Sequence, residues 1–134
     1  MQQQRLSINR GATLIIDNGG TKHLHIVLND PAVLEGYGLK LQVIVVPITT
    51  IYHDKHDKTV VLNIGDHEFL RHPSYVAYNF IHVYGCEELQ SIGFFNKAPV
   101  SDELLERIIT GALTSPHTKK YAKDLLRELT KCTI

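Results

Sequence analysis

The chain has 134 residues, of which 43% are hydrophobic, and its 14 basic and 14 acidic side chains leave no formal net charge. This composition is typical of a globular protein with one domain, and it excludes a disordered tail and a protein that coats nucleic acid by bulk electrostatics. Two cysteines do not make a disulfide framework. Residues 1–10 contain no apolar core of signal-peptide length, and no stretch approaches the length of a membrane helix, so we expect a cytoplasmic protein that does not enter a membrane. Eight histidines are many for this length, and each is a candidate acid, base or ligand near neutral pH.

The first part of the sequence predicts a hairpin of two strands. Residues 10–17 and 22–28 are rich in β-branched and apolar side chains, as strands are. The Asn-Gly-Gly segment between them favours a tight turn, because these residues adopt positive φ at little cost. Runs at 59–64 and 74–84 indicate two further strands.

The longest β-branched run of the chain is QVIVVPITT, residues 42–50. Such a run indicates a strand that is buried on both faces. Because proline cannot donate to a ladder, Pro47 predicts an edge, a bend or a bulge at the end of this strand. Thr49 and Thr50 follow where the backbone leaves the sheet, and they either close the strand or face a groove.

The last third of the sequence changes to helical spacing. Ser101 is an expected N-cap, and Asp102 and Glu103 in the first turn favour a helix. Ser115 followed by Pro116 predicts the start of a second helix, since proline is favoured at the first helical position. Both helices carry an apolar stripe.

Strands therefore come first and helices last. This order favours an antiparallel sheet or small barrel covered by C-terminal helices, and it argues against alternating βαβ units. We expect a single α+β domain over residues 1–134 that is mainly β. The strands fall within residues 1–98 and the two helices within residues 99–134.

Four pieces of the sequence carry a family likeness. Arg10-Gly11 precedes the first strand, residues 22–28 form the second, residues 43–50 match a Val-x-Val-x-Pro-hydrophobic-Thr-hydroxyl strand, and a late strand leads into a helix. In these motifs and their order, over about residues 10–112, the chain resembles the PemK/MazF (Kid-like) family of toxin endoribonucleases. The resemblance implies a small SH3-like antiparallel barrel, a homodimer, an RNA groove and a cognate antitoxin protein that occludes it.

The sequence departs from the family pattern at several places. Leu24 or His25 takes the position of a Pro in the second strand, and Thr50 takes that of a Ser, which keeps the hydroxyl. Ala12 stands where an acid usually follows Arg-Gly. In the late strand, His82 and Gly85 take the positions of an Arg that acts in catalysis and of an Asp. Either His82 or another residue performs the acid–base work, or this member does not cleave RNA.

Metal-independent RNA cleavage requires a base for the 2′-hydroxyl, an acid for the 5′-oxygen and donors for the phosphate. Histidine serves as either base or acid near neutral pH. His23 and His25 are two residues apart on one strand, so they share a face, which is also the pattern of a solvated hairpin face. Arg71 is a candidate phosphate clamp, or it neutralises Glu68 or Asp66 nearby. Tyrosines near these residues are candidates for stacking on unpaired bases.

We therefore expect a hydrolase-type endoribonuclease toxin that cleaves single-stranded RNA by attack of the 2′-hydroxyl, with no cofactor and no metal. The alternative is a non-catalytic barrel module that binds nucleic acid or a protein partner. The expected catalytic residues are His82, His25, Thr49 and Arg71. The expected RNA-binding residues are Thr50, Arg10, Lys22, His23, Tyr52 and Tyr78.

The segment His53-Asp54-Lys55-His56-Asp57 contains ligand types for a metal ion at short spacing. No distant set of ligands supports such a site, and clustered charges are more typical of a solvated loop. We expect a loop here.

Overall fold

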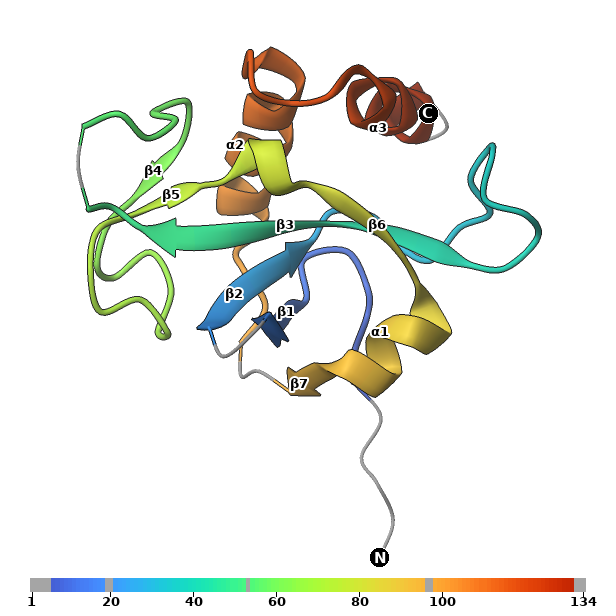
Figure 1. Cartoon of the computed structure of the whole chain (residues 1–134), viewed down its shortest axis with the longest axis horizontal. Coiled ribbons are helices and arrows are strands. Elements are labelled where there is room, and N and C mark those ends of the chain that lie inside the picture. Colours follow the sequence, from blue (N-terminus) through green and yellow to red (C-terminus); the bar gives the residue numbers. More distant parts are fainter. Residues whose placement is uncertain (1–5, 19–20, 53, 96–97, 132–134) are drawn as a thin grey trace, which may run out of the picture.

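The computed structural model describes residues 6–18, 21–52, 54–95 and 98–131, which fold into a sheet with helices on both sides (Figure 1). The strands are β1 Thr13–Asn18, β2 Thr21–Val27, β3 Gln42–Thr50, β4 Val61–Leu62, β5 Ser74–Val76, β6 His82–Gly85 and β7 Gly93–Phe95. The helices are α1 Cys86–Ile92, α2 Asp102–Thr114 and α3 Lys120–Lys131, and a single 3₁₀ turn, η1, spans Tyr78–Phe80. The α+β class, the early hairpin and the two C-terminal helices are confirmed.

Every strand pairing in the described part of the chain is antiparallel. The order is β4-β5-β3-β2-β1-β7, and β6 pairs with β3 beyond the end of β5. The two outer strands, β4 and β7, do not pair with each other among the described residues, so the sheet forms no closed barrel there. Both outer strands have only two or three residues, which leaves little unpaired backbone at the edges.

Strand β3 is the centre of the sheet, as its sequence predicts, and it runs through Pro47 without ending. One side of β3 pairs with β2. The other side pairs first with β6, up to Val45 and His82, and again with β5 from Ile48 onwards. The carbonyl of Pro47 accepts from Ala77 N on this second side, so the missing N–H of the proline falls where the partner strand is interrupted.

This interruption divides the strand that we expect over residues 74–84 into two short strands with η1 between them. Five residues, 77–81, lie opposite only Val46 and Pro47. The expectation of one continuous strand is therefore wrong. Pro47 does not end β3 as expected, and the irregularity lies instead in the partner strand opposite it.

Side chains alternate between the two faces of the sheet and build two apolar clusters. Ile44, Val46 and Ile48 of β3 pack with α2 and α3 in the larger cluster. Val43 and Val45 point the other way and pack with Leu89 of α1. One face of the sheet is therefore covered by α2 and α3, while α1 covers only one end of the opposite face (Figure 1).

The two C-terminal helices start differently from each other. Ser101 caps α2 as expected, since its hydroxyl accepts from Leu104 N at 3.1 Å. Ser115 instead ends α2 and donates to the Asp57 carboxylate at 2.7 Å, so the N-cap expected there is wrong and α3 begins only at Lys120.

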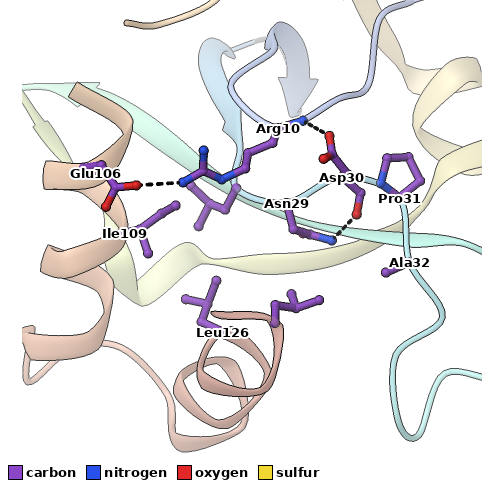
Figure 2. A pocket seen from close by; sticks show the side chains of 10 residues that line it. Arg10, Asn29, Asp30, Pro31, Ala32, Glu106, Ile109 and Leu126 are labelled. Carbon is purple, nitrogen blue, oxygen red and sulfur yellow. Dashed lines mark hydrogen bonds and ion pairs between the residues drawn. The ribbon is translucent and has the colours of Figure 1, made fainter. Parts of the chain in front are cut away.

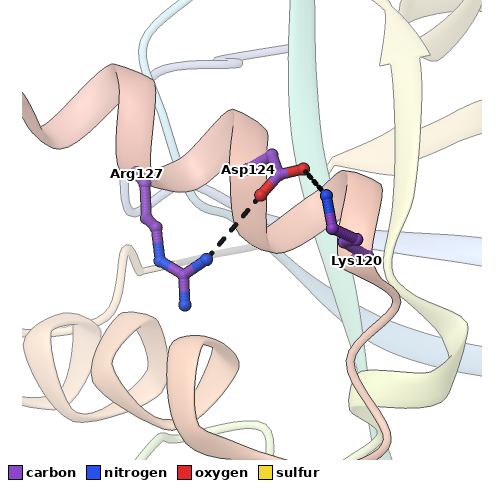
Figure 3. A network of polar contacts seen from close by, with 3 residues as sticks. All are labelled: Lys120, Asp124 and Arg127. Atoms are coloured by element: carbon purple, nitrogen blue, oxygen red, sulfur yellow. Dashed lines mark hydrogen bonds and ion pairs between the residues drawn. The ribbon is translucent and has the colours of Figure 1, made fainter.

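Helix α3 presents its apolar stripe to the core and its charges to solvent. Ala122 and Leu126 are buried. On the outer side, Asp124 pairs with Lys120 at 3.1 Å and with Arg127 at 3.7 Å (Figure 3). Exposed pairs of this kind contribute only a few tenths of a kcal/mol each, about 0.3–0.5, so burial of the stripe holds α3 in place.

Candidate functional site: two adjoining hollows

The sheet face opposite α2 and α3 brings three histidines to one place. In the strand register His25 lies opposite Pro47, His82 opposite Val45, and Thr49 opposite Tyr75. A hollow of about 380 Å³ opens over these pairs, and we call it the imidazole hollow. It is lined by His23, His25, Val45, Pro47, Thr49, Tyr75, Phe80, His82 and Tyr84.

His25 is the most constrained of these histidines. Its side chain is buried, with 4% exposure, and its Nδ1 lies 2.9 Å from the carbonyl oxygen of His23. A carbonyl only accepts, so Nδ1–H donates and Nε2 keeps the lone pair of the neutral ring. Burial lowers the pKa of His25 from 6.5 to about 4, outweighing the hydrogen bond to His23 that raises it, and the nearby His23 ring lowers it further. His25 is therefore a neutral base at physiological pH.

His82 stands on the other side of β3 and is exposed to solvent. Its ring meets that of Tyr84 edge to face, with 4.5 Å between the ring centroids. Burial, together with the charge of Glu88, raises the pKa of Tyr84, so its phenol remains a hydrogen-bond donor. Adjacent strands lie about 4.8 Å apart, which separates the backbones of β2 and β6 by about 10 Å and lets His25 and His82 approach a ligand from opposite sides.

A second hollow, of about 420 Å³, lies at the ends of β2 and β3, and we call it the basic hollow. The expected site residues that line it are Lys22, His23, Thr49, Thr50, Tyr52 and Arg71. His23 and Thr49 line both hollows, so the two adjoin each other. Eight of the ten residues expected from the sequence thus fall in one continuous surface region.

Arg71 is a solvent-exposed cation that lines the basic hollow. Its guanidinium donates to the backbone carbonyl of Glu68 at 2.6 Å. The Glu68 carboxylate accepts instead from Ala98 N, and the Asp66 carboxylate accepts from Asn63 N. No ion pair of Arg71 occurs among the described residues, so its charge is available to an anion in the hollow.

Tyr78 does not belong to the site, which corrects the expectation from the sequence. It is fully buried on the helix side of the sheet, and its hydroxyl donates to the carbonyl of Ile108 at 2.7 Å. Burial raises its pKa, and no RNA base can reach the ring. Tyr75 does line the imidazole hollow, but the His56 ring stacks on it at 4.3 Å.

Arg10 also lies elsewhere, in a separate hollow of about 700 Å³ between α2, α3 and the segment that follows β2 (Figure 2). Its guanidinium pairs with Glu106 at 3.0 Å, and its backbone N–H donates to Asp30 at 3.0 Å. Asn29 beside it satisfies backbone groups, accepting from Ile44 N at 2.7 Å. The structure thus separates Arg10 from the other expected RNA-binding residues.

Besides Tyr75, two aromatic residues of the imidazole hollow, Phe80 and Tyr84, are absent from the set expected from the sequence. Their spacing of two residues on either side of His82 was the available signal, because alternate strand residues share a face. The same alternation places Tyr78 on that face as well, and only the turn η1 separates the buried Tyr78 from the exposed Phe80.

The segment 53–57, which we expect to be a loop, lies partly outside the described residues, because His53 is not among them. Burial disfavours ionisation of Asp57, but hydrogen bonds from Thr59 and Ser115 outweigh it and lower the pKa of Asp57. Within the described ranges, no three His, Cys, Asp or Glu side chains are arranged to hold a metal ion.

Comparisons with known proteins do not assign the chain to a family. No protein-family model matches the chain, and the search of curated proteins found no match. Among the described helices, none combines the length and the apolar character needed to cross a lipid bilayer.

Proposed function

We propose that the protein is an endoribonuclease that cleaves single-stranded RNA through attack of the ribose 2′-hydroxyl on the adjacent phosphate. The observation that carries this proposal is the convergence of His25 and His82, from strands on either side of β3, on a hollow that adjoins a cationic one. Two imidazoles and a phosphate clamp are the parts that such a reaction needs.

His25 acts as the base in this proposal. Its neutral Nε2 accepts the proton of the 2′-hydroxyl, while the bond from Nδ1–H to the His23 carbonyl holds the ring in one tautomer. A pKa of about 4 makes free His25 a weak base. A phosphate bound nearby raises that pKa, because its negative charge favours the imidazolium.

His82 acts as the acid and gives its proton to the departing 5′-oxygen. The 2′-oxygen bonds to phosphorus, the bond from phosphorus to the 5′-oxygen breaks, and the products carry a 2′,3′-cyclic phosphate and a 5′-hydroxyl. Thr49 and Arg71 hold the phosphate oxygens, since Thr49 links the two hollows and Arg71 has no ion-pair partner among the described residues. His82 thereby takes the role that an Arg holds in the PemK/MazF family.

The RNA continues through the basic hollow. Lys22, His23 and Thr50 face its backbone there, and Tyr52, with 80% of its surface exposed, is available for a base. With a net charge of zero, the chain relies on this local patch rather than on bulk attraction.

The same proposal extends to the biological setting that the resemblance implies. We propose that the protein is a cytoplasmic toxin of a toxin–antitoxin system and that it forms a homodimer. Its sheet then corresponds to an SH3-like barrel that is not closed. The cognate antitoxin then covers the two hollows, because that position blocks the RNA.

The test is cleavage of a long single-stranded RNA by purified protein in the presence of a chelator. We expect fragments with cyclic phosphate ends, and His82→Ala or His25→Ala should slow their formation by about 10²- to 10⁴-fold. His117→Ala, which removes an exposed histidine beyond α2, is the matched control and should cleave as the wild type does.

Two outcomes contradict the enzyme. Intact RNA that nevertheless binds would support the alternative, a non-catalytic module. Cleavage that His82→Ala and His25→Ala leave unchanged would remove both histidines from the mechanism.

A further inference from the structure

Phe80 is an exposed aromatic residue at the imidazole hollow. Its side chain retains 64% exposure although it lines the imidazole hollow beside His82. A phenyl ring offers no hydrogen bond, and water gains nothing from contact with it. An exposed aromatic ring at the rim of the hollow has the position that a stacking platform for an unpaired base needs.

The backbone holds Phe80 in this position through η1. Tyr78, two residues earlier, is locked into the core by its hydroxyl bond to Ile108. Within the turn, Phe80 N donates to the carbonyl of Ala77 at 3.0 Å, and Ala77 N donates to the carbonyl of Pro47 at 3.0 Å. The break opposite Pro47 thus sends one aromatic ring into the core and the next one to the site.

The surroundings of Phe80 suit a flat, partly apolar group. Val45 and Pro47 supply apolar lining to the hollow, while Tyr84 and His82 supply hydrogen-bonding groups. The rings of His82 and Tyr84 contact each other, and Phe80 makes no ring contact among the described residues. Its face is therefore available for stacking.

We propose that Phe80 is the platform on which an unpaired RNA base stacks, next to the phosphate held between His25 and His82. This inference rests on the proposed function and assigns the base-recognition part of the same site. Every nucleobase has a π-face, so a phenyl platform orders the strand without selecting one base. Ordering that base also places the neighbouring 2′-hydroxyl against the catalytic groups.

The test compares the binding of two proteins to each of two ligands that cannot be cleaved. Wild type and Phe80→Ala are each titrated with an octamer of 2′-deoxyuridine and with an abasic octamer of the same length. We expect Phe80→Ala to bind the base-bearing octamer about tenfold more weakly, as loss of one stacked base predicts. It should bind the abasic octamer as the wild type does.

Matched variants separate stacking from other effects. Phe80→Tyr keeps an aromatic face and should retain binding, whereas Phe80→Leu keeps only apolar surface and should resemble Phe80→Ala. Ile64→Ala removes another exposed apolar side chain, one with 63% exposure that lines neither hollow, and should change nothing.

The outcomes distinguish this inference from the function on which it rests. Equal weakening with both octamers would show a structural role and refute stacking, as would wild-type binding of both octamers by Phe80→Ala. If wild type binds neither octamer and no RNA, the proposed function fails, and the platform fails with it.

Discussion

The buried imidazole of His25 makes the stability of the protein depend on pH in a way that one substitution should remove. In the unfolded chain histidine takes up a proton below pH 6.5, whereas in the folded protein burial delays this to about pH 4. Between these two values the unfolded state binds the extra proton, so acid favours unfolding. The contribution is fully present above pH 6.5 and is lost as the pH falls toward 4.

The size of the effect follows from the two pKa values. Each tenfold change in proton affinity corresponds to about 1.4 kcal/mol, so His25 should cost about 2.5 kcal/mol of stability between pH 7.5 and pH 4.5. This is a large share of the roughly 5–15 kcal/mol that stabilises a typical domain.

The assay is urea unfolding of wild type and His25→Gln at a series of pH values. Glutamine does not titrate, and its amide retains a donor for the His23 carbonyl. The wild type should lose about 2.5 kcal/mol more than His25→Gln over this range. Ile26→Val, a neighbouring core variant that keeps His25, should follow the wild-type slope although its stability is lower. Parallel curves for wild type and His25→Gln would refute this account of the buried imidazole.

Two further predictions concern the parts of the fold that support the site. Gly111→Ala places a methyl group against the Tyr78 hydroxyl and Val60, so it should lower the free energy of unfolding by about 1–3 kcal/mol despite the better helix propensity of alanine. Urea unfolding measures this, and a more stable variant would show that the core yields there. Asn29→Ala leaves the buried Ile44 N–H without its acceptor and should cost about 2 kcal/mol in the same assay; an unchanged midpoint would mean that another group takes over the bond.

Most features of the candidate site can be predicted from short-range patterns in the sequence. The bounds of residues 42–50 follow from the unbroken β-branched run. The shared face of His23 and His25 follows from the period of two along a strand. The cap at Ser101 follows from side-chain chemistry within a few residues. Such features depend on near neighbours, so the order of the residues is enough to predict them.

Contacts between residues distant in the sequence determine the other features of the site. Tyr78 and Phe80 have similar rings two residues apart, yet one is fully buried and the other is exposed. No local pattern distinguishes them, because the break opposite Pro47 sets the turn and Ile108 of α2 provides the acceptor for Tyr78. Arg10 similarly pairs with Glu106, 96 positions away, and is held apart from the histidines.

The sequence by itself determined the class of the fold, the central strand and the shared face of His23 and His25, because these follow from residue pattern within a few residues. Only the tertiary structure decided that His25 and His82 line one hollow from either side of β3, since strand neighbours are chosen by packing over long sequence separations. It also decided that the described sheet stays open and that an exposed phenyl ring borders the histidines.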